Sequence, residues 1–101
     1  MAEEIYKPAQ CPEVSISHDE KDEGLVVEVE LPGVKKEEIK LTISSKAFCV
    51  SADREDIKYE GCYQFAHEVD KEKAKAKFEN GLLKFGVPFR EPLKGTKVEI
   101  E

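Results

Sequence analysis

The sequence lacks any long apolar run and any excess of positive charge. Its 101 residues carry 16 Lys and Arg against 22 Asp and Glu, a net charge of −6 with both signs interspersed. No run approaches the roughly 20 apolar residues that span a bilayer, and the opening Met-Ala-Glu-Glu has neither the basic nor the apolar region of a signal peptide. Nucleic acids and anionic membranes both favour basic patches. We therefore expect a cytoplasmic protein with no nucleic-acid or membrane partner.

The chain has few cysteines, and their spacing matches no common disulfide framework or zinc site. The three cysteines are Cys11, Cys49 and Cys62, an odd number with no CxxC pair. Disulfide frameworks and zinc sites usually need paired or closely spaced cysteines. Free cysteine is among the residues most often buried in proteins. The sequence therefore predicts reduced thiols in or near the core.

The residue combinations of common catalytic and metal sites are missing. The two histidines, His18 in an acidic stretch and His67 in a predicted strand, are interpreted as structural or solvated. Cys62 lies near His67 but has no third group to orient a thiolate–base pair. The six glycines never form GxGxxG or a P-loop, and EF-hand spacing is absent. We predict no enzyme activity, cofactor or metal.

The sequence does contain short apolar segments of alternating pattern, separated by turn residues. A period of two is typical of strands with one buried face. Residues 35–38 allow one helical turn, while residues 1–10 are interpreted as a frayed tail and 54–60 as a charged loop. The pattern predicts an all-β fold in one domain, an immunoglobulin-like two-sheet antiparallel sandwich of seven or eight short strands. Its strands are expected within residues 13–18, 25–31, 39–44, 48–53, 62–69 and 74–88.

Residues 74–88 give the clearest local prediction. Asn80-Gly81 suits a type I′ hairpin turn, because both central residues of that turn need a positive φ. Pro88 lacks a backbone donor and ends the second strand. Between turn and proline, apolar residues alternate with Lys84 and Gly86, which gives one apolar face formed by Leu83, Phe85 and Val87.

The amino-acid sequence of this hairpin closely resembles the closing signature of the alpha-crystallin domain of small heat-shock proteins. The matching residues are Ala76-x-Phe78-x-Asn80-Gly81-Leu82-Leu83-x-Phe85-x-Val87-Pro88. Upstream, residues 27–34 end in Pro-Gly-Val like a strand of that family. Phe48-x-Val50-x-Ala52-x-Arg54 is similar to the family's Leu-x-Ile-x-Gly-x-Arg, with alanine in the glycine position. The resemblance spans residues 13–88.

The resemblance implies a domain layout and a binding groove. It implies a short N-terminal tail at residues 1–11, an alpha-crystallin-like domain at 12–90 and a C-terminal extension at 91–101. Val98-Glu99-Ile100 matches the family's tail motif, which docks into an apolar groove of a neighbouring domain by strand addition. The alternative is that residues 98–100 form a final edge strand of the same domain. The resemblance maps the groove onto Leu41, Ile43, Ala74 and Ala76.

The sequence departs from the family in two places. Only residues 55–60 separate Arg54 from Gly61, too few for the long loop that swaps between partners in many members. A dimer would then pair edge strands instead, through residues 62–69. The N-terminal arm, which contributes to client capture in the family, is barely a dozen residues long.

The resemblance implies an ATP-independent holdase, a stress-response chaperone that binds unfolding clients and self-associates. The alternative is an adaptor of the CS-domain type that docks on a larger chaperone. The short connection and the short arm suit an adaptor, but CS domains commonly carry a tryptophan and this chain has none. A third possibility is co-assembly with a longer paralogue.

Overall fold

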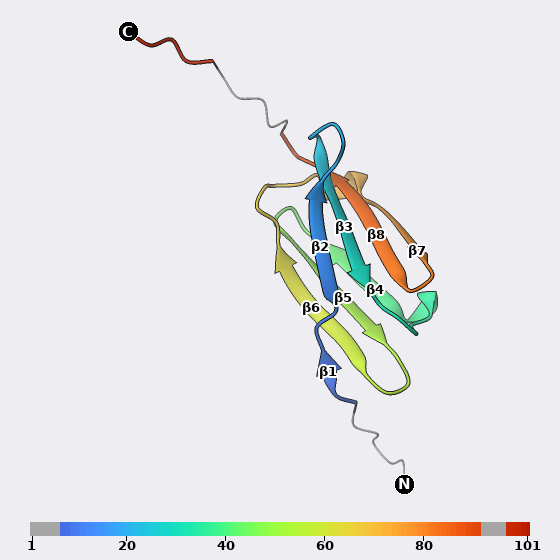
Figure 1. Ribbon diagram of the computed structural model, residues 1–101. Coiled ribbons are helices and arrows are strands. Elements are labelled where there is room, and N and C mark those ends of the chain that lie inside the picture. The colour runs from blue at the N-terminus through green and yellow to red at the C-terminus, as the bar shows by residue number, and fades with distance from the viewer. Residues whose placement is uncertain (1–6, 92–96) are drawn as a thin grey trace.

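The computed structural model describes residues 7–91 and 97–101, and it is a sandwich of two β-sheets (Figure 1). This confirms the predicted all-β class. One-turn 3-10 helices η1 (Lys36–Glu38) and η2 (Lys71–Lys73) lie between strands, and no helix in the described ranges is long and apolar enough to cross a membrane. The strands are β1 Ala9–Gln10, β2 Glu13–His18, β3 Gly24–Glu30, β4 Ile39–Ile43, β5 Ala47–Asp53, β6 Lys58–Gln64, β7 Lys75–Glu79 and β8 Leu82–Pro88.

Each sheet has four strands. The first has the order β1-β6-β5-β4 and the second the order β2-β3-β8-β7. All neighbours are antiparallel except β1, which runs parallel to β6. The edge strands β4 and β7 therefore belong to different sheets.

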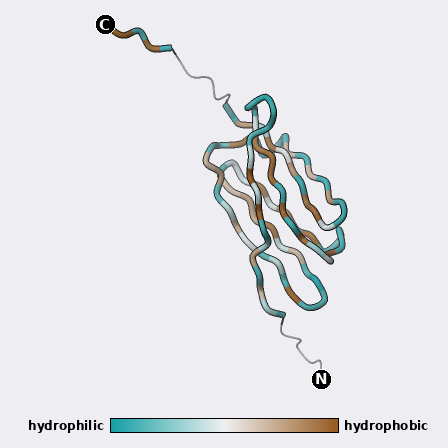
Figure 2. Tube along the Cα trace, viewed as in Figure 1, coloured by the Kyte–Doolittle hydropathy of each residue, from teal (hydrophilic) through white to brown (hydrophobic). Residues whose placement is uncertain are grey.

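The alternating pattern buries one face of each central strand between the sheets. Val27, Val29 and Ala52 are fully buried, and apolar residues recur along the strands (Figure 2). The Phe48 ring of β5 lies 5.1 Å from the Phe85 ring of β8, centroid to centroid, in an edge-to-face arrangement. Phe48 thus joins the two sheets at the centre of the core.

The Asn80-Gly81 turn is confirmed in detail. Asn80 has φ 50° and Gly81 has φ 80°, as a type I′ turn requires. The Leu31 amide donates to the Gly81 carbonyl at 2.7 Å. A Cβ on Gly81 would lie 3.3 Å from the Pro32 Cα. The hairpin turn and the Pro-Gly-Val turn, two separate parts of the family resemblance, therefore pack directly on each other.

The predicted boundaries of one strand are wrong. Residues 54–60 were expected to be a loop and 62–69 a strand, but β6 begins at Lys58 and ends at Gln64. The Arg54 amide donates to the Ile57 carbonyl at 2.9 Å, so the connection from β5 is a tight turn. Tyr59 is buried in the core while Lys58 and Glu60 extend outward. The charged residues on both sides of Tyr59 made the start of this half-buried strand look like a loop in the sequence.

The predicted frayed tail also extends too far. Ala9 and Gln10 form β1, which pairs with Lys58 and Tyr59 of β6. Pairing of this kind uses backbone groups, so exposed polar side chains give no sign of it. Residues 1–6 of the predicted tail and 92–96 of the predicted extension lie outside the described ranges.

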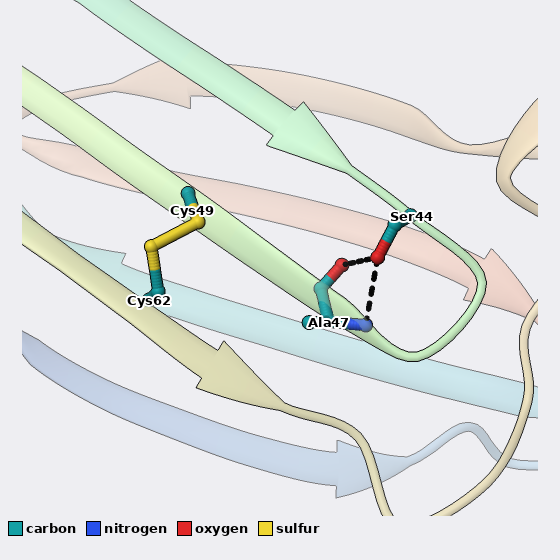
Figure 3. The surroundings of a disulfide bond; sticks show 4 residues. All are labelled: Ser44, Ala47, Cys49 and Cys62. Atoms are coloured by element: carbon teal, nitrogen blue, oxygen red, sulfur yellow. Dashed lines mark hydrogen bonds between the residues drawn. A yellow bond between two sulfur atoms is a disulfide. The ribbon is translucent and has the colours of Figure 1, made fainter.

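The prediction of reduced, buried cysteines is wrong in both respects for Cys49 and Cys62, and wrong in burial alone for Cys11. Cys49 and Cys62 form a disulfide between β5 and β6, and both are exposed rather than in the core (Figure 3). Cys11 is free and exposed. Because Asp53 pairs with Lys58, the antiparallel register places Cys49 directly opposite Cys62. The sequence prediction missed this pair because it began the strand four residues too late.

Candidate peptide-binding groove

A cavity of about 330 Å³ opens between the edges of the two sheets. Leu41 of β4 and Ala76 of β7, two of the predicted groove residues, both line it. Apolar side chains dominate its wall, and two lysines stand among them. The complete lining is Lys36, Ile39, Leu41, Ala76, Lys77, Phe78 and Leu83.

The other two predicted groove residues lie beside this cavity rather than in it. Ile43 at the end of β4 and Ala74 just before β7 are half-buried and pack against the core. The sequence interpretation missed Ile39 and Phe78. The signal was present, because each lies two residues from a predicted groove residue and so faces the same side of its strand.

Both strands that border the cavity have a free edge. Within the described residues, β4 pairs only with β5, and β7 pairs only with β8. An unpaired edge presents backbone donors and acceptors to an incoming strand. An apolar cavity between two such edges is suited to bind an extended peptide, because backbone groups provide hydrogen bonds and the cavity accepts alternate side chains.

The rim of the groove is basic. Lys36 and Lys77 line it, and Lys77 forms an ion pair with Glu79 at 3.0 Å. Exposed lysines on edge strands oppose uncontrolled pairing with other chains. They also favour an occupant that carries negative charge.

The tail motif is available for contact. Val98 and Ile100 are 76% and 93% exposed. Residues 97–101 form no strand in the described part of the chain and lie apart from the sandwich (Figure 1). Two large apolar side chains are thus presented to solvent on alternate positions.

Arg54, from the family-like motif of β5, anchors the turn before β6. Its Nη1 donates to the Pro32 carbonyl at 3.0 Å, and its guanidinium lies 5.6 Å from the centre of the Tyr59 ring. Its Nη2 donates to Asp56 Oδ2 at 2.9 Å, and this pairing lowers the pKa of Asp56. Arg54 therefore ties the β5–β6 connection to the Pro-Gly turn.

The two histidines serve as packing groups at the end of the sandwich where the chain leaves β8. Their rings lie 5.6 Å and 5.2 Å from the Phe89 ring, centroid to centroid, for His18 and His67 respectively. His18 Nδ1 also lies 2.7 Å from Asp22 Oδ1. These contacts fit the structural role predicted from the sequence.

A pair of like charges on β2 and β3 gives a testable pH dependence. Glu13 and Glu30 lie directly opposite each other, and a hydrogen bond to Glu13, together with its charge, raises the pKa of Glu30. Glu30 therefore binds a proton more tightly in the folded state than in the unfolded state. Its contribution to the free energy of unfolding is full below the ordinary glutamate pKa, and it is lost as pH rises through the raised pKa of the folded state. We expect Glu30→Gln to raise the melting temperature slightly at neutral pH and to leave it unchanged below the ordinary glutamate pKa.

Thermal melts of the wild type and Glu30→Gln at both pH values check this prediction. Glu20→Gln, in an exposed turn, is the control for loss of one acidic charge. Equal melting temperatures of Glu30→Gln and the control at neutral pH would contradict the prediction.

Comparisons with known proteins agree with the geometry. A model of the Hsp20/alpha crystallin family matches residues 17–101. The small heat shock protein C2 of Rickettsia felis is 27% identical over 98 residues, which cover 81% of this chain and 64% of that protein. The chain thus spans less than two thirds of that relative's length.

Solved structures share the fold. Heat shock protein 16.0 from Schizosaccharomyces pombe superposes with a TM-score of 0.72 at 24% identity, over 91% of this chain and 99% of that one. HSP18.5 from E. histolytica gives a TM-score of 0.73 at 16% identity, over 90% and 99% of the two chains. With the family match over most of its length, the chain belongs to the Hsp20/alpha crystallin family.

Proposed function

We propose that this chain is an ATP-independent holdase that binds unfolding client proteins and slows their aggregation. The observation that carries the proposal is the apolar cavity between two unpaired strand edges, β4 and β7, in a member of a chaperone family. Aggregation proceeds through apolar segments and strand edges exposed on partly unfolded chains. A groove that offers both backbone pairing and apolar contact matches those segments.

The proposed occupant of the groove at rest is the tail of a second copy. With Val98 and Ile100 directed into the groove, Glu99 and Glu101 would face outward, because side chains alternate along a strand. The basic rim formed by Lys36 and Lys77 would then meet acidic side chains. The four predicted residues remain our proposal for the binding site: Leu41 and Ala76 line the cavity, and Ile43 and Ala74 lie beside it.

The mode of self-association and the location are proposals too. The tight turn between Arg54 and Ile57 leaves no loop long enough to swap, so we propose dimers that pair exposed strand edges, such as residues 60–64 of β6, which β1 leaves unpaired. Co-assembly with a longer paralogue would supply an additional client-binding arm. We place the protein in the cytoplasm.

A client-aggregation assay tests the function. An unrelated, heat-labile protein is heated with a several-fold molar excess of this chain, without ATP, and light scattering is recorded. We expect scattering to fall strongly relative to the same excess of an inert protein of similar size. Full aggregation of several unrelated clients would rule out the holdase.

The second candidate is an adaptor of the CS-domain type that docks on a larger chaperone. The tight β5–β6 turn favours it, because a chain with no swapping loop could remain a monomer. Size in solution separates the two functions. A discrete monomer at all concentrations favours the adaptor, while a dimer or larger assembly favours the holdase.

A further inference from the structure

The Cys49–Cys62 disulfide lies on the outer face of the first sheet, away from the core. Figure 3 shows the disulfide between β5 and β6. Both cysteines are exposed, and they help to form a shallow depression of about 390 Å³. Among the residues that the structure describes, no aromatic side chain lines this depression. The depression is lined by Lys40, Thr42, Val50, Ser51, Glu60 and Gly61 together with the two cysteines.

We propose that this disulfide is a thiol–disulfide exchange site for small anionic thiols. The thiolate of the small molecule attacks the Cys62 sulfur, a mixed disulfide forms on Cys62, and Cys49 leaves as a thiolate. A second thiolate then attacks the sulfur of the small molecule in the mixed disulfide. This step releases the small-molecule disulfide and leaves Cys62 as a thiolate, so two small thiols are oxidised for each protein disulfide that is reduced. Access to sulfur is the first requirement for this chemistry, and the exposure of both cysteines meets it.

The surrounding charges decide which sulfur is attacked. Lys40 pairs with Ser51 and Thr42 pairs with Cys49, so Lys40 is a diagonal neighbour of Cys49, at a typical spacing of about 7–8 Å. Cys62 lies one strand further from Lys40. A nearby ammonium group favours a thiolate, so Lys40 stabilises Cys49 as the leaving group. It also attracts an anionic thiol to the depression.

The acidic side of the depression is partly neutralised. Glu60 is two residues from Cys62 on the same face of β6, where its charge would repel an incoming thiolate. Its carboxylate forms an ion pair with Lys58 at 3.7 Å. Lys40, by contrast, takes part in no ion pair among the described residues, so its charge is available beside Cys49.

The exchange site is separate from the peptide-binding groove. On β4, Lys40 and Thr42 face outward to the disulfide, whereas Leu41 faces the groove. The proposal therefore does not depend on the holdase function. In a reducing compartment, where disulfides are rare, exchange with the thiol pool would hold the pair as a dithiol. In an oxidising compartment the disulfide would persist.

Reaction with reduced glutathione tests the proposal. The folded Cys11→Ser protein, whose only cysteines are the pair, is mixed with excess glutathione, quenched with a thiol-alkylating reagent and mapped by mass spectrometry. We expect an early species with glutathione on Cys62 and the alkyl group on Cys49, followed by alkylation of both cysteines. Lys40→Gln should slow the reaction on the order of threefold, whereas Lys84→Gln, an exposed lysine of the other sheet, should not.

Several outcomes would overturn the proposal. Alkylation of both cysteines before glutathione is added would show that the purified protein holds no disulfide. Reaction only in denaturant would show that the sulfur atoms are not accessible in the fold. A mixed disulfide on Cys49, or equal rates for Lys40→Gln and Lys84→Gln, would contradict the assigned direction of attack.

Discussion

Replacing both Cys49 and Cys62 with serine is expected to lower the free energy of unfolding by about 3 kcal/mol. The two residues are 13 apart in sequence, and a cross-link that closes a loop of this size restricts the unfolded chain. The exposed serines themselves add little cost, because their hydroxyl groups remain hydrated. For a single small domain, whose total stability is about 5–15 kcal/mol, this is a large share.

Urea unfolding of the oxidised wild type and of the double variant measures this difference. Cys11→Ser is the matched control, since it removes an exposed cysteine that has no disulfide partner. The control should unfold like the wild type, and reduction of the wild type should reproduce the loss seen in the double variant. A double variant as stable as the wild type would show that the cross-link does not contribute to the fold.

Changing Ala76 to glutamate is expected to weaken binding of the tail to the groove by at least about tenfold, or about 1.4 kcal/mol. Ala76 is exposed at an edge strand and lines the cavity, so the fold should tolerate the longer side chain. The new carboxylate would fill space that Val98 or Ile100 needs, and it would repel Glu99 and Glu101. The measurement is fluorescence anisotropy of a labelled peptide of residues 94–101 with protein that lacks residues 92–101.

Ser17→Glu provides the matched control for this variant. Ser17 is an exposed residue of β2, the opposite edge strand of the same sheet. The Ser17→Glu variant should bind the peptide like the unmodified protein, because it adds the same charge away from the groove. Equal loss in both variants would mean that net charge, and not the groove, governs binding.

The parts of this fold that follow from local physics could be predicted from the sequence. Asn80-Gly81 specified its turn because few residues tolerate two successive positive φ angles. The alternation at Val27, Val29 and Leu83 predicted central strands correctly, because one face of each is buried. The family resemblance rested on these same local features.

The parts that depend on register or on contacts between distant segments could not be predicted. Tyr59 is flanked by charged residues, so the start of β6 resembled a loop. Without the correct start of β6, the register that places Cys49 opposite Cys62 could not be recognised. The pairing of β1 involves backbone groups that any sequence has. The groove was located in part, because its cavity also depends on how β4 of one sheet lies against β7 of the other and on Lys36 of η1.

The most direct test of the groove is to map where the tail binds by NMR. Isotope-labelled protein lacking residues 92–101 is titrated with the unlabelled peptide of residues 94–101, and backbone amide shifts are followed. We predict that the largest shifts lie along β4 and β7, including Leu41 and Ala76, and are absent in Ala76→Glu. Shifts centred on β2 or β6, or none at high peptide concentration, would contradict a binding groove between β4 and β7.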